Sequence, residues 1–79
     1  MPRYTLTSAY SGPYAVVAGD IIQNDGGGKI YVAKAASTPA NDTNSLEMLD
    51  MDVVRVQAAG NIYARAHDGS ALLKVVPVI

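Results

Sequence analysis

Apolar residues along this chain occur in short runs that are separated by glycine-rich or polar turns. Arg3 to Ala9 alternates polar and apolar positions, and Asp-Gly pairs at residues 25–26 and 68–69 lie between later apolar runs. Short runs bounded in this way are typical of β-strands, because glycine tolerates the positive φ of a tight turn. The pattern predicts strands at 3–9, 14–18, 20–24, 29–35, 52–57, 61–66 and 70–78. We therefore expect an all-β fold of about six to eight short strands.

One long polar segment interrupts this pattern at residues 36–45. It contains Pro39 and is rich in small polar residues, so it predicts an exposed loop. Asn44 and Glu47 stand three positions apart, which is the spacing of a capping box. This spacing predicts at most one helical turn, over residues 45–49.

Two segments of the chain match each other without a gap at an offset of 32 residues. Residues 20–22 (DII) align with 52–54 (DVV), Gly28 aligns with Gly60, and residues 30–31 (IY) align with 62–63 (IY). The match predicts two repeat-related hairpins, at 19–35 and 51–66, inside a single domain that spans residues 1–79. Such a pair suits a small antiparallel sandwich or barrel with pseudo-twofold symmetry. The alternative is that two hairpins with similar turns resemble each other by chance.

The composition indicates that this domain is short of internal stabilisation. The chain has 79 residues, no cysteine and one histidine. Disulfides, thiolate metal sites and an ordinary zinc site are therefore not expected, and no cofactor is expected. Only 16% of the residues are charged, against roughly 25% in an average domain. Because a small protein with few charges leaves apolar surface uncovered, we expect a homo-oligomer or assembly onto a larger structure.

The net charge and the apolar runs exclude two other classes of partner. The net charge is −1, whereas nucleic-acid binders usually carry a basic excess that neutralises phosphates. No apolar run has the length that spans a bilayer, and the first residues contain no hydrophobic signal core. We therefore expect no nucleic acid and no membrane as partner.

Several residues have the side chains of a catalytic site but not its spacing. His67, Asp68 and Ser70 lie within one tight turn, whereas a hydrolytic triad converges from separate elements. Asp20 and Asp52 are repeat-related carboxylates, and an aspartate at the start of a strand more often binds local backbone donors. The sequence therefore predicts a protein that is not an enzyme.

Aromatic residues alternate with cations in both repeat copies. Tyr31 lies between Lys29 and Lys34, and Tyr63 lies close to Arg65. On a sheet face, these residues could stack against sugar rings or bases. Alternatively, the two tyrosines pack in the core and the cations are solvated. Carbohydrate is the ligand that this pattern favours.

Residues 52–78 resemble short β-rich proteins of tailed-bacteriophage particles. The run VVRVQAAGNIYARAHDGSALLKVV combines a valine-rich strand, a glycine turn, an aromatic residue followed by Ala-Arg-Ala, and a final apolar strand. The resemblance implies a virion structural protein, such as a capsid decoration or cement protein or a head-fibre component. It also implies a trimer that is made in the host cytoplasm and docks on the major capsid protein or another virion protein. This chain is shorter than the best-known decoration proteins and lacks their long N-terminal arm, which leaves the mode of attachment open.

These considerations suggest three contact surfaces and one ligand surface. The contact surfaces are residues 3–7 of the N-terminal strand with Leu6, the polar loop 36–45 with Pro39, and residues 72–78 of the last strand with Leu73. An exposed edge strand among them could add to the sheet of a neighbour through main-chain hydrogen bonds. The alternative function is a carbohydrate- or receptor-binding module of a phage tail or fibre, with Tyr31, Tyr63 and Arg65 at its site.

Overall fold

The computed structural model describes residues 3–40 and 45–77, which form eight β-strands and no helix. The strands are β1 (Arg3–Leu6), β2 (Ser11–Val16), β3 (Ile21–Asn24), β4 (Ile30–Lys34), β5 (Leu46–Met48), β6 (Val53–Arg55), β7 (Gly60–Ala66) and β8 (Ala71–Val76). All the strand pairs are antiparallel. The prediction of an all-β antiparallel fold is confirmed.

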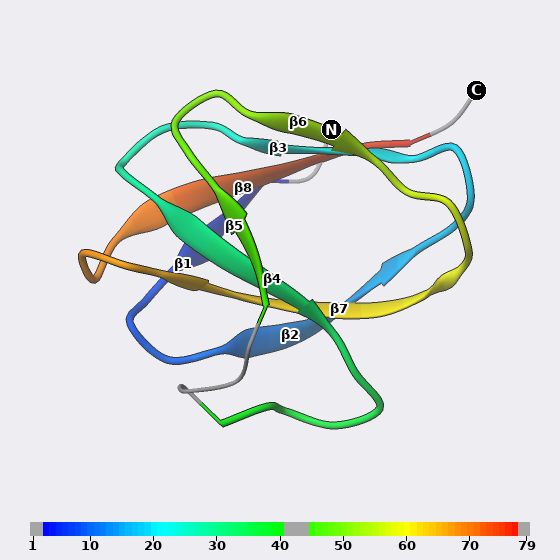
Figure 1. Cartoon of the computed structure of the whole chain (residues 1–79), viewed down its shortest axis with the longest axis horizontal. Helices are drawn as coiled ribbons and strands as arrows, with labels where there is room; N and C mark the ends of the chain where they lie inside the picture. Colours follow the sequence, from blue (N-terminus) through cyan, green and yellow to red (C-terminus); the bar gives the residue numbers. More distant parts are fainter. Residues whose placement is uncertain (1–2, 41–44, 78–79) are drawn as a thin grey trace.

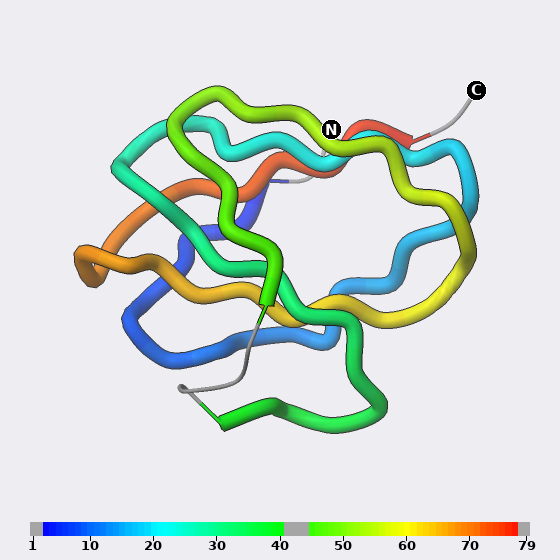
Figure 2. Tube along the Cα trace, viewed as in Figure 1, coloured from blue at the N-terminus to red at the C-terminus, as the bar shows by residue number. Residues whose placement is uncertain are grey.

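The strands form two four-stranded sheets that pack face to face (Figure 1). Sheet A has the order β1-β8-β3-β6, and sheet B has the order β2-β7-β4-β5. The tube in Figure 2 shows that the chain crosses repeatedly from one sheet to the other. The fold is therefore a small β-sandwich, which decides between the sandwich and the barrel that the sequence left open.

The core lies between the sheets because successive residues of a strand point to opposite faces. In β8, Ala71, Leu73 and Val75 are buried while the residues between them are more exposed. Ile30 and Val32 of β4 face the same core from sheet B. The other buried members of this core are Leu6, Val16, Ile22, Met48, Ile62, Ala64 and Ala66.

The two repeat copies pair with each other rather than within themselves. We predicted hairpins at 19–35 and 51–66, and both segments are strand–turn–strand units. However, β3 lies in sheet A and β4 in sheet B, and β6 and β7 are divided in the same way. Instead β3 pairs with β6, and β4 pairs with β7. Each turn therefore carries the chain between sheets and does not close a two-stranded ladder.

The register of these pairs shows that the repeat is a structural pseudo-twofold. At an offset of 32 residues, the equivalents are Ile22 and Val54, and these two residues are partners in the β3–β6 pair. Val32 and Ala64 are likewise equivalent, and they are partners in the β4–β7 pair. A residue that faces its own equivalent marks a symmetry axis, so one axis passes through both sheets.

Hydrogen bonds at the ends of the strands obey the same symmetry. The Val17 amide donates to the Asp20 carboxylate at 2.9 Å, and the Leu49 amide donates to the Asp52 carboxylate, also at 2.9 Å. Both aspartates therefore bind local backbone donors, as predicted. The residue before each aspartate has a left-handed backbone, with φ 95° at Gly19 and φ 66° at Met51. The second turn thus keeps the conformation of the first although it has lost the glycine.

The segment between the repeat copies differs from its prediction. Residues 46–48 form β5, an edge strand that pairs with β4, where we expected a helical turn. A strand forms here in spite of the capping-box spacing, because it places Met48 in the core opposite Ile30. Residues 36–40 form an irregular segment, and Pro39 within it is half-buried. Residues 41–44 of the predicted loop lie outside the described residues.

Asn24 is a buried polar residue that ties three parts of the chain together. Its side chain is fully buried, and its amide nitrogen donates to the carbonyl oxygens of Gly28 at 2.7 Å and Met48 at 3.0 Å. Its side-chain oxygen accepts a hydrogen bond from the Gly26 amide at 3.2 Å. Asn24 therefore satisfies backbone groups of the β3–β4 turn and of β5.

Replacing Asn24 with alanine should destabilise the domain by about 2–4 kcal/mol, because buried backbone groups then lose their partners. Urea denaturation followed by circular dichroism measures the free energy of unfolding. Asn61→Ala is the matched control, since Asn61 is exposed on β7, and it should cost less than about 0.5 kcal/mol. Equal effects of the two substitutions would contradict this role of Asn24.

Candidate functional site

The predicted ligand residues come together on the outer face of sheet B. Tyr31 of β4 lies directly opposite Arg65 of β7, and Ala33 lies opposite Tyr63. Because opposite residues of an antiparallel pair share a face, these four side chains form one cluster on the outside of the sandwich. Tyr10, which precedes β2, packs against Ala33 and Tyr63 there.

Arg65 lies against two aromatic rings of this cluster. The central carbon of its guanidinium is 4.4 Å from the centroid of the Tyr31 ring and 5.7 Å from that of Tyr10. One terminal nitrogen donates to the Ser8 carbonyl oxygen at 3.5 Å, while the buried Nε makes no hydrogen bond within the described residues. A cation over an aromatic face is stabilising, so Arg65 joins β7 to β4 and to the segment before β2.

Tyr31 is further fixed by neighbours at the end of β4. Its hydroxyl is 2.9 Å from Nδ1 of His67. Lys29 lies 5.7 Å from the ring centroid and forms an ion pair with Glu47 at 3.2 Å. The hydrogen bond to Glu47 is the main reason that the pKa of Lys29 is raised. These contacts hold the ring edge-on to His67 and covered on one face by Arg65.

The cluster is built more for packing than for stacking a ligand. Tyr63 is only 4% exposed, so its ring is closed to a sugar or a base. Tyr31 is half-buried, and the guanidinium of Arg65 covers one face of its ring. Of the two interpretations that the sequence left open, packing suits the position of Tyr63. For the carbohydrate alternative, the cluster offers only the partly accessible ring of Tyr31, which provides little surface for stacking a sugar.

Two of the predicted contact residues lie inside the core. Leu6 and Leu73 are both 0% exposed. Leu73 is flanked by Tyr4 of β1 and Asn24 of β3, so β8 is an inner strand of sheet A. These leucines therefore cannot form a contact surface in the folded domain. The alternation of β8 buries Leu73 rather than exposing it.

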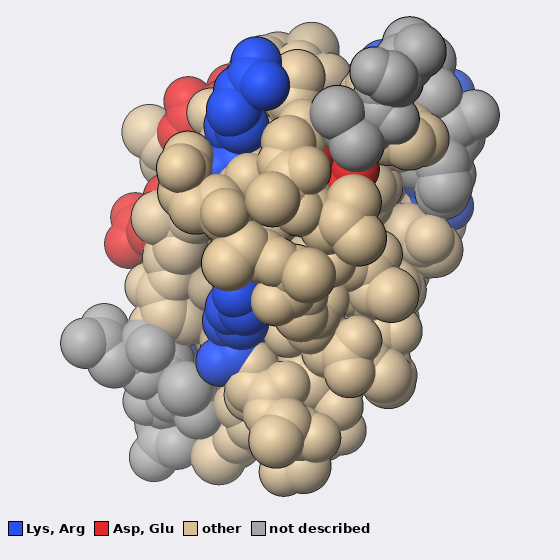
Figure 3. Space-filling model, turned by 90° about the vertical axis from the view of Figure 1, so that its right-hand side faces the viewer, with Lys and Arg blue, Asp and Glu red and all other residues tan. Residues whose placement is uncertain are grey.

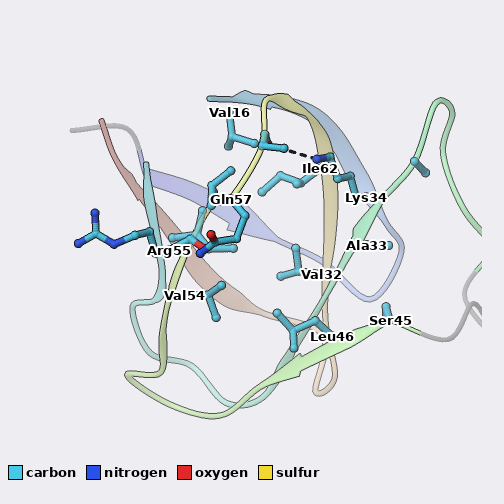
Figure 4. A pocket seen from close by; sticks show the side chains of 14 residues that line it. Val16, Val32, Ala33, Lys34, Ser45, Leu46, Val54, Arg55, Gln57 and Ile62 are labelled. Atoms are coloured by element: carbon cyan, nitrogen blue, oxygen red, sulfur yellow. Dashed lines mark hydrogen bonds between the residues drawn. The ribbon is translucent and has the colours of Figure 1, made fainter. Parts of the chain in front are cut away.

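A hollow of about 590 Å³ lies between β6 of sheet A and β4 and β5 of sheet B. Figure 4 shows Val54, Val32 and Leu46 converging on it from these three strands. Val16, Ile22 and Ile62 add to its apolar lining, and Lys34 at its margin donates to the Ala58 carbonyl oxygen at 3.2 Å. We call this space the β6 hollow. The sequence does not indicate this hollow, because its existence depends on which strands pair.

Exposed apolar side chains gather beside the β6 hollow. Among the described residues, six large apolar side chains are exposed, and four of them fall within residues 46–53. These four, Leu46, Leu49, Met51 and Val53, extend from the edge strand of sheet B to the edge strand of sheet A. We call them the β5–β6 strip. Figure 3 shows one end of the molecule, where uncharged residues predominate and the Lys, Arg, Asp and Glu side chains lie in a few separate groups.

The ionisable side chains of the described residues do not assemble into a metal centre. Within residues 3–40 and 45–77, no group of three or more His, Asp or Glu side chains could hold a metal ion. His67 and Asp68 lie 3.9 Å apart on an exposed turn, as neighbours in the sequence. In the same two ranges, no helix is long and apolar enough to cross a bilayer.

Comparison with known proteins assigns the chain to no family. No protein-family model matches it, and neither the curated proteins nor the solved structures that were searched gave a match. The function therefore has to be inferred from the geometry of the surfaces.

Replacing Tyr63 with alanine should lower the free energy of unfolding by about 3–5 kcal/mol, the usual cost of removing a buried aromatic ring. Tyr31→Ala should cost about 1–2 kcal/mol, because that ring is only half-buried. Thermal and urea denaturation of the two variants provide the comparison. A Tyr63→Ala variant as stable as the unmodified chain would show that the outer cluster does not hold the sheet together.

Proposed function

We propose that this chain is a non-catalytic structural protein whose function is assembly. The observation that carries the proposal is the β5–β6 strip, where exposed apolar residues follow the edges of both sheets. Scattered apolar residues are normal on a protein surface, but a contiguous group is typical of an interaction site. Burial of this group in an interface would add the apolar contact that a domain of this size lacks.

The edges themselves support an assembly function. One terminal strand of each sheet carries a member of the strip, since Leu46 lies on β5 and Val53 on β6, and Leu49 and Met51 lie in the connection between these strands. Proteins that avoid edge-to-edge association usually protect such strands with charges, proline or a covering loop. Here the charge on β5, Glu47, is already paired with Lys29, and β6 carries the single charged residue Arg55. Both edges are thus only weakly protected against association.

We further propose that the assembly is a bacteriophage particle. This part rests on the resemblance of residues 52–78 to small virion proteins, which suggests a capsid decoration or cement protein. In this role the chain would form a homo-oligomer, with a trimer favoured, and would dock on the major capsid protein or another virion protein. The weakly charged surface supports this role, since apolar contact with a partner does not require a charged site.

If the β5–β6 strip mediates self-association, replacing Leu49 with lysine should dissociate the oligomer. Leu49 is 57% exposed, and loss of its apolar contact should cost about 2 kcal/mol per interface, or roughly thirtyfold in affinity. Light scattering of the unmodified chain and the variant, each over a tenfold dilution, measures the solution mass. The unmodified chain should be an oligomer and the variant a folded monomer.

Val17→Lys provides a matched control for this experiment. Val17 is the repeat equivalent of Leu49, is 50% exposed, and donates its amide to a turn aspartate in the same way. It lies outside the strip, so its substitution should leave the mass unchanged. A monomeric unmodified chain, or equal dissociation by both variants, would refute self-association through the strip.

A further inference from the structure

The strand order obeys the pseudo-twofold in sheet B, although β5 pairs with β4 two residues out of the register that β2 has with β7. In sheet A the strand order does not obey it. Exchanging the two copies turns the order β2-β7-β4-β5 into itself, with β2 replacing β5 and β7 replacing β4. In sheet A the exchange replaces β3 with β6. The outer side of β3 is occupied by β8, but within residues 3–40 and 45–77 no strand pairs with the outer side of β6. One strand position of the symmetric arrangement is therefore vacant.

In the other copy, β8 occupies the outer side of β3, which is the equivalent of the open side of β6. It runs antiparallel to β3, with Val75 opposite Ile22 and Leu73 opposite Asn24. Both side chains are buried between the sheets. The pairing continues beyond β3. There the Asp25 amide donates to the Leu72 carbonyl oxygen at 2.8 Å, and the Leu72 amide donates to the Gly26 carbonyl oxygen at 3.0 Å.

The β6 hollow occupies the corresponding place beside β6. Residues 54–58 line it, and these are the equivalents of residues 22–26, which contact β8. Its lining also includes Ile62, the equivalent of Ile30 in the filled half of the core. The hollow is thus the counterpart of the space that Leu73 and Val75 fill.

The backbone of β6 is oriented to receive a strand there. The Val56 amide and the Asp52 carbonyl oxygen bond to Asp20 and Asn24, on the side of β3. Because backbone groups alternate in direction along a strand, those of Val53 and Arg55 point to the outer side. Their equivalents in β3, Ile21 and Gln23, are the positions that face Val76 and Lys74 of β8.

The chain does not offer a matching strand from the equivalent position of its own sequence. At the offset of 32 residues, the sequence equivalent of β8 is the segment 39–44, which follows β4. Its sequence is PANDTN. It contains a proline and lacks the alternating apolar residues of β8. In Figure 1, residues 36–40 leave β4 at the far side of the molecule from β6. A strand that fills the hollow is therefore expected from another molecule.

We propose that β6 and the β6 hollow accept an extended segment of a partner protein, antiparallel to β6, by strand addition. The segment would carry small or branched apolar residues at alternating positions, as β8 does, and an acidic residue between them. This inference rests on the proposed assembly function and specifies how the partner docks. Main-chain hydrogen bonds to an open edge provide affinity in such complexes, and alternate side chains in pockets provide specificity.

The acidic position follows from a difference between the two copies. Gln23 of β3 faces Lys74 of β8, whereas the equivalent of Gln23 in β6 is Arg55. Figure 4 shows the Arg55 guanidinium pointing away from the hollow, on the outer face. A residue opposite Arg55 would share that face, where a carboxylate attracts the guanidinium and a lysine repels it. The sequence of β8 in a second copy would place Lys74 there, so a different partner is favoured.

A peptide titration tests the proposal. The probes are a peptide with the sequence of residues 70–77, SALLKVVP, and the same peptide with Lys74→Glu. They are titrated into the ¹⁵N-labelled full chain and into its Leu49→Lys variant, which removes competition from self-association. The glutamate peptide should shift the amide signals of residues 53–58 and bind about five- to tenfold more tightly than the lysine peptide. In an Arg55→Glu variant the preference should reverse.

Val53→Pro tests the main-chain contacts. The substitution removes an amide that points to the outer side of an edge strand, a position at which proline is tolerated. The variant should remain folded and lose peptide binding at least tenfold. Equal affinity of the two peptides, unchanged binding by Val53→Pro, or the absence of shifts at residues 53–58 in both proteins would overturn the inference. Dissociation of the oligomer by Leu49→Lys is independent of these results and tests the assembly function separately.

Discussion

The antiparallel pairing between the two repeat copies is the constraint on which the rest of the structure depends. Ile22 faces Val54 in sheet A, and Val32 faces Ala64 in sheet B. Each copy therefore contributes one strand to each central pair, and neither copy could close a sheet on its own. The turns, the inward positions and the places left for β2, β5 and β8 all follow from these two pairs. Because the contacts join distant parts of the sequence, the fold forms only when both copies are present.

The symmetry of this framework is broken by the strands added around it. β1 and β8 close one half of the sandwich, where Tyr4 of β1 stacks on Tyr14 of β2 with 4.2 Å between the ring centroids. The repeat equivalent of Tyr14 is Leu46, which is exposed at the open half. The same position of the repeat thus packs against the core in one copy and contributes to the β5–β6 strip in the other, where β5 is shifted by two residues relative to β2. The proposed assembly surface arises from this incomplete symmetry rather than from a specialised group of side chains.

The sequence predicted the local features of the fold better than its pairing. Alternation and turn residues located every strand except β5, and the 32-residue repeat proved to be structural. The hairpins were predicted from the repeat, but a turn between two strands indicates only that the chain reverses and not which sheet the next strand joins. Asn44 and Glu47 suggested a helical turn, whereas burial of Met48 favours a strand. The β6 hollow could not be predicted, because it exists only once β8 has been assigned to β3.

The burial pattern also explains why several side chains that were predicted to contact a partner or a ligand are buried. Leu6 and Leu73 belong to strands whose alternation turns them into the core, and Tyr63 is covered on the outer face by Tyr10. Exposed apolar residues occur instead in the short strands β5 and β6, whose three residues each carry little alternation for a sequence to show. Apolar residues can remain exposed on a short edge strand with little loss of folding stability, because such a strand contributes few side chains to the core. The proposed assembly surface therefore lies where the periodic signal of the sequence is weakest.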